Sequence, residues 1–392
     1  MAGVKQLDSV HKTYLDYAAS TPINEKVLEV MLPYFSEVFG NPSSIHSYGQ
    51  RAEAAIEDAR ETVAFIFNVA PEEVIFTSCG TESDNLAIRG AAFSKRETTG
   101  ANRILISPVE HHAVLETANQ LSKYFGFILE FLPVDEFGRV DPEEVKASIR
   151  SDTAIVSVIY ANNEIGTINP IEEIAAVCRE RGVLFHSDAV QAAAHLTINL
   201  EKTLVDLLAI GAHKFYGPKG VGCLIIRKGT RLLPVITGGS HEYGLRAGTP
   251  NVPYIVGLAE ALKITTGALE SRSDSLYALR EYVIDNVLAT IPRCRLTGHP
   301  KERLPNHASF VFEDVDANLL LAMLDMAGFA CSSGSACKVG TPKPSEVLIA
   351  IGLSKNWAMG SLRVTLGRET TKEVIDHFLS VLPRLVEQVR KK

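Results

Sequence analysis

The sequence predicts an α/β fold in which a mainly parallel sheet is surrounded by helices and is followed by a smaller second domain. Short apolar runs rich in Val and Ile alternate with helical stretches from residue 74 to residue 226. Strands without polar alternation are typical of a sheet that is covered on both faces. Ligands bind where the strands of such sheets end, so we expect the functional residues there.

The expected strands of this sheet are short. They are 74–77, 103–107, 154–160, 183–186 and the two apolar runs 205–210 and 223–226. A helix is expected before them, over 44–68, because Ala52, Ile56, Ala59 and Val63 recur there at helical spacing.

The chain after Pro253 is expected to leave the first domain through a long helix and to build the smaller domain. Its strands are expected at 308–312 and 361–366, and its helices near 316–328 and 371–390. The predicted divisions are an N-terminal arm 1–14 that packs with the small domain, a large domain 15–262, and a small domain 263–392 with a mobile loop 330–345.

The composition is that of an ordinary soluble globular protein, with 46% hydrophobic and 22% charged residues. The net charge of -7 gives no support to nucleic acid as a direct partner, because phosphate binding needs a basic face. No apolar run reaches the roughly 18 residues of a membrane span, and the amino terminus lacks a signal-peptide core, so we expect a cytoplasmic protein without a membrane partner. The six cysteines contain no CxxC pair, so neither a metal site nor a disulfide framework is expected.

Lys214 lies in a glycine-rich connection between two of the expected strands. A lysine in a turn is usually solvated. A lysine that is desolvated near cationic or aromatic groups instead has a lowered pKa and acts as an amine nucleophile, as a Schiff base with pyridoxal phosphate requires. That interpretation needs an acid, a ring platform and a phosphate site from other segments.

Three segments that follow expected strands offer these groups. Residues 77–87 pass from a strand into a helix, and Gly80 with the free amides of the helix start suits a phosphate, although such residues are more often only caps. Asp188 can pair with a protonated pyridine nitrogen and Gln191 can reach the ring oxygen, whereas a simple Asp cap is about as frequent. His111 can stack on a ring or move protons near neutral pH, and its adjacent histidine does not face it as a second metal ligand would.

Two residues near the carboxyl end are candidates for substrate chemistry. Cys337 lies beside Lys338 in a loop of small residues, where a thiol is accessible and partly ionised. Arg363 stands among apolar neighbours in an expected strand, where a carboxylate clamp or a buried ion pair would justify it. The amides of 161–166 can orient a substrate, and the long glycine-rich loop 238–251 is of a kind that serves a site or an interface.

Together and in this order, these segments resemble the cysteine desulfurase family, the class V branch of the fold-type-I pyridoxal phosphate enzymes. The resemblance covers nearly the whole chain. It is carried by Asn41-Pro-Ser-Ser44, Thr81-Glu82 with Asn85, Glu110-His111, Asn162-Asn163-Glu164, Asp188-Ala-Val-Gln191, Ala212-His213-Lys214, Arg246 to Thr249, Ser332 to Cys337, and Arg363. It implies a large domain with a mainly parallel seven-stranded sheet and a smaller α+β domain.

The resemblance also implies the cofactor, pyridoxal 5'-phosphate, and its contacts. Lys214 would form the internal aldimine, Asp188 would pair with the pyridine nitrogen, and His111 would stack on the ring and assist proton transfer. The other implied contacts are Gly80, Thr81 and His213 at the phosphate, Gln191 and Asn163 at the ring hydroxyl or substrate, and Thr249 from the other subunit of a homodimer.

The implied substrate is L-cysteine. Arg363 would clamp its carboxylate and Cys337 would attack its sulfur, which gives L-alanine and a persulfide on Cys337. The sulfur would pass to an acceptor protein for iron–sulfur cluster assembly, tRNA thiolation or a similar use. The alternatives are another fold-type-I lyase or aminotransferase, such as a selenocysteine lyase, and a noncatalytic scaffold for sulfur-transfer proteins.

Three positions depart from the commonest pattern of the family. Gly211 stands where a serine phosphate ligand is usual, Cys79-Gly80 stands where Gly-Ala is usual, and His241 stands where glutamine is frequent. The first change removes one hydroxyl, so cofactor affinity is expected to be lower unless another group compensates. These changes leave the cellular branch open, including specialised donors such as those of DNA phosphorothioation.

Overall fold

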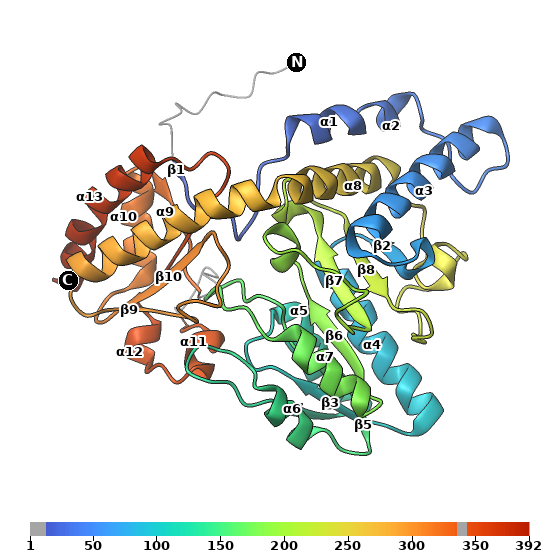
Figure 1. The fold of residues 1–392 in the computed structure, drawn as a ribbon, viewed down its shortest axis with the longest axis horizontal. Helices are drawn as coiled ribbons and strands as arrows, with labels where there is room; N and C mark the ends of the chain where they lie inside the picture. The colour runs from blue at the N-terminus through green and yellow to red at the C-terminus, as the bar shows by residue number, and fades with distance from the viewer. Residues whose placement is uncertain (1–12, 335–342, 392) are drawn as a thin grey trace. The chain divides into compact units, whose positions relative to one another are not determined.

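The computed structural model describes residues 13–334 and 343–391, apart from the side chain of Glu270. By their contacts the residues form two compact units, which are described separately below (Figure 1). Unit 1 takes Met1–Ala19, Glu164–Gly166 and Ser271–Lys392, and unit 2 takes Ser20–Asn163 and Thr167–Glu270.

Unit 2 is built on one seven-stranded sheet. In spatial order its strands are β2 (Val74–Thr77), β8 (Gly222–Ile226), β7 (Leu207–Gly211), β6 (Leu184–Asp188), β5 (Thr153–Ser157), β3 (Arg103–Ile106) and β4 (Ile128–Phe131). Strand β8 runs antiparallel to both β2 and β7, and the other pairs are parallel. Because two reversals cancel, β2 points the same way as β7. The carboxyl ends of β2, β3, β5, β6 and β7 therefore share one edge of the sheet.

Helices surround this sheet. They are α1 (Glu25–Met31), α2 (Pro33–Ser36), α3 (Ser47–Phe67), α4 (Gly80–Thr99), α5 (His112–Phe125), α6 (Pro142–Ser148), α7 (Ile171–Glu180) and α8 (Val252–Gly267), with 3-10 turns η1 (Pro71–Glu73), η2 (Ala192–Ala194), η3 (Ala212–Lys214) and η4 (Glu242–Gly244). Helix α4 packs across β5, β6, β7 and β8, and α3 packs along α8 (Figure 1). The core between the sheet and α4 and α5 contains Ile75, Ile88, Ile104, Val114 and Ile155.

The strands and the helix predicted for this region are confirmed, with ends that move by a few residues. Strand β4 was missed although three of its four residues are apolar, because Glu130 interrupts the apolar run; its side chains are half-buried or exposed at the sheet edge. The prediction of a single long helix after Pro253 was wrong in one respect. The structure has two helices there, α8 and α9 (Leu269–Thr290), which are interrupted at Ala268.

Unit 1 contains an antiparallel sheet in the order β12 (Ser361–Thr365), β10 (His307–Phe312) and β9 (Cys294–Leu296), and a parallel pair of β1 (Thr13–Tyr14) with β11 (Phe329–Ala330). Its helices are α9, α10 (Ala317–Met326), α11 (Glu346–Ala350), α12 (Lys355–Ala358) and α13 (Lys372–Arg390). Its core is formed by residues such as Phe310, Phe312, Leu320, Val364 and Phe378. The two predicted strands and two predicted helices are confirmed, whereas β9 and β11 are too short for a periodic pattern.

Within residues 13–334 and 343–391, no single helix is both long and apolar enough to cross a membrane, although the bent pair Val252–Gly267 and Ser271–Thr290 passes the same test jointly.

Candidate active site

The backbone around Lys214 is held from two sides. The amide and the hydroxyl of Thr21 both donate to the carbonyl of His213, each at 2.9 Å. On the other side, the Thr265 hydroxyl of α8 donates to the Phe215 carbonyl at 3.0 Å. The Lys214 side chain is half-buried. These bonds fix the turn that carries the amine at the carboxyl end of β7.

Close backbone contacts shape the start of α4. A Cβ on Gly80 would lie 2.6 Å from Val190 Cγ2, and one on Gly222 would lie 2.6 Å from the carbonyl carbon of Cys79. The Cβ position of Gly211 lies 3.4 Å from the Gly80 nitrogen. The first amides of a helix have no partner within the helix and attract anions. The glycines therefore let the start of α4 pack closely against its neighbours, and its first amides are suited to an anion such as phosphate.

Two predicted phosphate contacts differ in exposure. Thr81, in the first turn of α4, is exposed. His213 is half-buried, and its Nδ1 lies 3.4 Å from the Ser20 hydroxyl. Burial and the positive charges of Lys214 and Lys219 lower the pKa of His213 to about 4. The imidazole is therefore neutral at neutral pH and is available as a hydrogen-bond partner.

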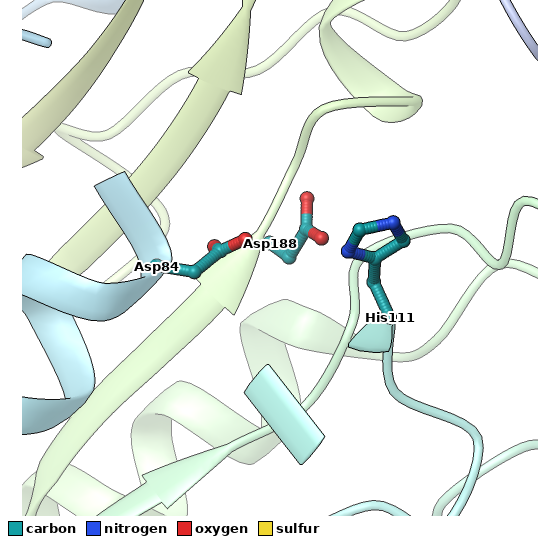
Figure 2. Close-up of side chains that lie close together, drawn as sticks. All are labelled: Asp84, His111 and Asp188. Carbon is teal, nitrogen blue, oxygen red and sulfur yellow. The ribbon is translucent and has the colours of Figure 1, made fainter. Parts of the chain in front are cut away.

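Asp188 and His111 meet at the edge where β6 and β3 end. Asp188 Oδ1 accepts from the Val190 amide at 2.9 Å. His111 caps α5, because its Nδ1 accepts from the Ala113 amide at 3.1 Å. Asp188 lies between His111 and Asp84, and one nitrogen or oxygen atom of each of these three lies within 4.8 Å of the others (Figure 2).

Burial dominates the ionisation of this group. Burial, followed by the negative charge of Asp84, raises the pKa of Asp188 to about 6. Burial lowers the pKa of His111, and the nearby charge of Lys214 lowers it further, whereas Asp188 opposes the shift. Two carboxylates and an imidazole can bind a cation, and the protonated nitrogen of a pyridine ring satisfies the same negative charge through a single N–H.

Gln191 and Asn163 follow the ends of neighbouring strands. Gln191 is buried three residues after Asp188, just before η2, and Asn163 is half-buried after β5. The adjacent Asn162 is structural, because its Nδ2 donates to the Val109 carbonyl at 2.7 Å and ties two of the loops together.

Thr249 belongs to a second part of unit 2. It is exposed, and with Arg246 and Ser78 it lines a pocket beside the end of β2. Arg246 Nε lies 2.8 Å from Glu82 Oε1, and the Ser78 amide donates to Glu82 Oε2 at 2.9 Å. Although burial opposes it, these hydrogen bonds lower the pKa of Glu82. The pair fixes the loop of Thr249 beside the start of α4.

In unit 1, Arg363 is buried in the middle of β12, opposite Ser309 of β10. Its Nη2 donates to Asp16 Oδ1 at 2.8 Å, and the Ser332 hydroxyl donates to Asp16 Oδ2 at 2.7 Å. The backbones of Ser332 and Arg363 also pair. The guanidinium is thus oriented along one edge by a carboxylate that is itself held in place.

Glu164 is a second carboxyl of unit 1. Its Oε2 accepts from the Ser345 hydroxyl at 2.5 Å, and a Cβ on Gly334 would lie 2.6 Å from the same oxygen. Burial raises the pKa of Glu164 to about 7, although Ser345 and the charge of Arg363 oppose the shift. Glu164 therefore contacts residues on both sides of the segment 335–342.

The predicted site residues are distributed between the two units. Unit 2 contains Gly80, Thr81, His111, Asn163, Asp188, Gln191, His213, Lys214 and Thr249, and unit 1 contains Arg363. Cys337 lies outside the described residues. Sequence reasoning missed the contributions of Asp84, Thr21, Asp16 and Ser345. Only Asp84 gave a local signal, as a charge on the apolar face of a helix.

Comparisons with known proteins identify the family of this chain. Residues 13–378 match the family model described as aminotransferase class-V. The chain is 47% identical over 379 residues to a protein named cysteine desulfurase IscS from Dictyoglomus turgidum, with 97% of this chain and 95% of that protein covered. It is 45% identical over 377 residues to a protein of the same name from Methanosarcina thermophila, with coverages of 96% and 92%. A solved structure titled NifS-like protein aligns with a TM-score of 0.89 and 36% identity, and covers 96% of this chain and 100% of that chain. This chain therefore belongs to the class-V aminotransferase family, in its cysteine desulfurase branch.

Proposed function

We propose that this chain is a pyridoxal-phosphate-dependent cysteine desulfurase, a sulfurtransferase that converts L-cysteine to L-alanine and places the sulfur on Cys337 as a persulfide. The observation that carries the proposal is the meeting of Lys214, Asp188, His111 and the Gly80 backbone at one edge of the sheet. The identity with named cysteine desulfurases over nearly the whole chain supports it.

The cofactor would be held by groups from several strand ends. The start of α4 at Gly80 and Thr81, with His213, would receive the phosphate, and Asp188 would accept the ring N–H. Gln191 would reach the ring hydroxyl. Asn163 and, from a second subunit, Thr249 would complete the contacts. The bound cofactor supplies an electron sink for the α-carbon of the substrate.

Two side chains of unit 2 would move protons. Lys214 Nζ would take the α-proton of the substrate, because its backbone is fixed at the site and its amine is half-buried. His111 Nδ1 accepts from the Ala113 amide, so its neutral ring carries the proton on Nε2. His111 would therefore act as a donor through Nε2 and cover one face of the ring.

The substrate would be oriented by Arg363 and attacked by Cys337. The Arg363 guanidinium, which Asp16 holds at 2.8 Å, would bind the substrate carboxylate by a charge-assisted pair. The Cys337 thiolate would form a bond to the substrate sulfur while the carbon–sulfur bond breaks and its electrons return to carbon. The outer sulfur of the persulfide would then pass to a thiol of a sulfur-acceptor protein, and the Cys337 thiolate would be restored.

The test is the absorption spectrum of the purified protein with pyridoxal phosphate, before and after L-cysteine, with alanine quantified. The parent is expected to show a visible band that changes with cysteine and to form alanine. Cys337→Ala is expected to keep the band and lose alanine formation, and Lys214→Ala is expected to lose both. Cys294→Ala, at a half-buried thiol of unit 1, is the matched control and should behave as the parent.

Two outcomes would overturn the proposal. Equal alanine formation by the parent and Cys337→Ala would exclude Cys337 as the nucleophile and favour a lyase or an aminotransferase. A protein that stays colourless with added pyridoxal phosphate, or that binds it without consuming cysteine, would favour a noncatalytic scaffold.

A further inference from the structure

Asp188 is surrounded by further buried acids that the proposed reaction does not use. Asp84, in the second turn of α4, is 1% exposed, and Glu110, in the loop after β3, is 5% exposed. Asp84 lies on the far side of Asp188 from His111 (Figure 2). Burying even one unpaired carboxylate is costly, and like charges this close cannot all ionise. The cluster therefore needs protons at defined atoms.

A chain of polar side chains runs from Asp84 through His186 to Ser157. Asp84 Oδ1 lies 3.4 Å from His186 Nε2, and His186 Nδ1 lies 2.8 Å from the Ser157 hydroxyl. Ser157 and His186 are paired residues of β5 and β6. Glu110 lies close to this chain, where its Oε1 accepts from the Ile159 amide at 2.6 Å and its Oε2 has no hydrogen-bond partner among the described residues.

The tautomer of His186 decides the direction of the proton in this chain. In one of its two neutral tautomers, His186 Nδ1–H donates to the Ser157 hydroxyl. Burial lowers the pKa of His186 to about 4, so the ring is neutral and its Nε2 then carries only a lone pair. Nε2 needs a donor, and the atom that faces it is Asp84 Oδ1. Both atoms are buried and have no hydrogen-bond partner among the described residues.

The charges that face Asp84 favour the same assignment. Asp84 lies near His186 and Asp188 of β6, Glu110 and His111, and none of these four neighbours is a lysine or an arginine. Burial raises the pKa of Asp84 well above its usual range, and burial with the charges of Asp188 and Asp84 does the same for Glu110. Asp188 has the Val190 N–H and the charges of both His111 and His186 to stabilise its negative charge, and these oppose the effect of burial on its pKa.

We propose that Asp84 is a neutral acid that donates its proton to His186 Nε2, at the head of a chain that continues from His186 to Ser157, and that this makes it a positioning residue for the cofactor. The chain leaves Asp188 as the anionic carboxylate that faces the ring nitrogen. Asp84 acts through His186 and Asp188, which are on the same face of β6. The inference rests on the proposed function for the identity of the cofactor, whereas the protonation pattern belongs to the protein alone.

The direct test is the tautomer of His186 in the full-length protein without cofactor. Nitrogen-15 NMR of histidine-labelled protein distinguishes a ring protonated on Nδ1 from one protonated on Nε2, and His186→Gln assigns the signal among the 11 histidines. The Nδ1–H form with a hydrogen-bonded Nε2 is expected. An Nε2–H form at neutral pH would mean that Asp84 is ionised and would overturn the proposal.

Cofactor affinity supplies a second readout. Asp84→Asn keeps a neutral donor to Nε2, so the affinity for pyridoxal phosphate and its pH dependence should stay within about twofold of the parent. Asp84→Leu removes the donor and should weaken binding by roughly tenfold, since a buried acceptor is left without a partner. The matched control is Asp206→Asn, because Asp206 lies at the opposite end of β7, where it accepts from the Phe185 amide at 2.9 Å.

The two proposals fail in different ways. If the parent binds no pyridoxal phosphate, the proposed function fails, and the His186 tautomer still decides the protonation of Asp84. If the parent binds the cofactor and Asp84→Asn shifts the pH dependence of binding by a unit or more, the neutral-acid assignment of Asp84 fails alone. If Asp84→Leu does not fold, the comparison of Asp84→Asn with the parent is enough to decide whether Asp84 is neutral.

Discussion

The two units stabilise the buried charged groups of their candidate sites in opposite ways. Unit 2 gathers Asp84, Glu110 and Asp188 with imidazoles, and burial raises the pKa of each carboxyl. Unit 1 sets the guanidinium of Arg363 against Asp16 in a direct ion pair at 2.8 Å. A carboxyl cluster without a guanidinium takes up protons, whereas a guanidinium stays charged and needs an anion. The first arrangement suits a cationic ring nitrogen, and the second suits a substrate carboxylate.

The largest expected effect in this comparison comes from removing the cation of unit 1. Arg363→Ala should lower kcat/KM for L-cysteine roughly thirtyfold or more. This corresponds to a loss of about 2–5 kcal/mol of transition-state stabilisation, because the substrate carboxylate and Asp16 both lose their partner. Pyridoxal phosphate affinity should not change. Alanine formation and cofactor titration measure the two quantities. Arg293→Ala removes a half-exposed arginine of unit 1 as the control, and a normal kcat/KM in Arg363→Ala would contradict the clamp.

A smaller loss is expected when the partner of the clamp is neutralised. Asp16→Asn keeps the shape of the side chain but weakens a charge-assisted bond, so KM for L-cysteine should rise by about tenfold with little change in kcat. Steady-state kinetics of alanine formation separate these constants. A fall in kcat at constant KM would mean that Asp16 does not act through the orientation of Arg363.

The pH dependence of stability should change with Glu164→Gln. In the folded state the pKa of Glu164 is about 7 against a usual 4.5, so between these values the folded state binds more protons than the unfolded state. Stability therefore falls as pH rises from 4.5 to 7, by at most about 3 kcal/mol. Glu164→Gln, which can still accept from Ser345, should lose this dependence and be the more stable protein at pH 8. Urea unfolding at pH 5 and pH 8 measures the free energy of unfolding of both proteins. An equal change of this free energy with pH in the parent and in Glu164→Gln would refute the prediction.

The smallest expected effect is a gain in unit 2. Gly211 has an extended backbone (φ -140°), and its Cβ position lies 3.4 Å from the Gly80 nitrogen, so a serine fits there. Gly211→Ser should tighten pyridoxal phosphate binding by about tenfold, because it adds a hydroxyl to the phosphate site. Gly211→Ala adds a carbon without the hydroxyl and so separates the two effects. Equal cofactor affinities for Gly211→Ala and Gly211→Ser would exclude a direct hydrogen bond from the serine hydroxyl to the phosphate.

Local patterns were enough to predict most of the elements near the site. The buried strands on both sides of Lys214 show as apolar runs, and the start of α4 shows as a glycine after a strand. Edge strand β4 (Ile128–Phe131) does not, because Glu130 interrupts its apolar residues. The motif residues Asp188 and His111 could also be named in advance, since Asp188 ends β6 and His111 follows β3, and both strands show as apolar runs.

The sequence by itself determined six of the seven strands of the unit 2 sheet and two strands and two helices of the small domain, because hydrophobic periodicity and helix starts depend on near neighbours. Only the tertiary structure decided which acids share protons and which meet a cation. Asp16 and Arg363 are separated by 347 positions, and Asp84 meets His186 only after α4 packs on β6. Burial and partner distance determine the ionisation of these side chains, and both arise from contacts between distant segments.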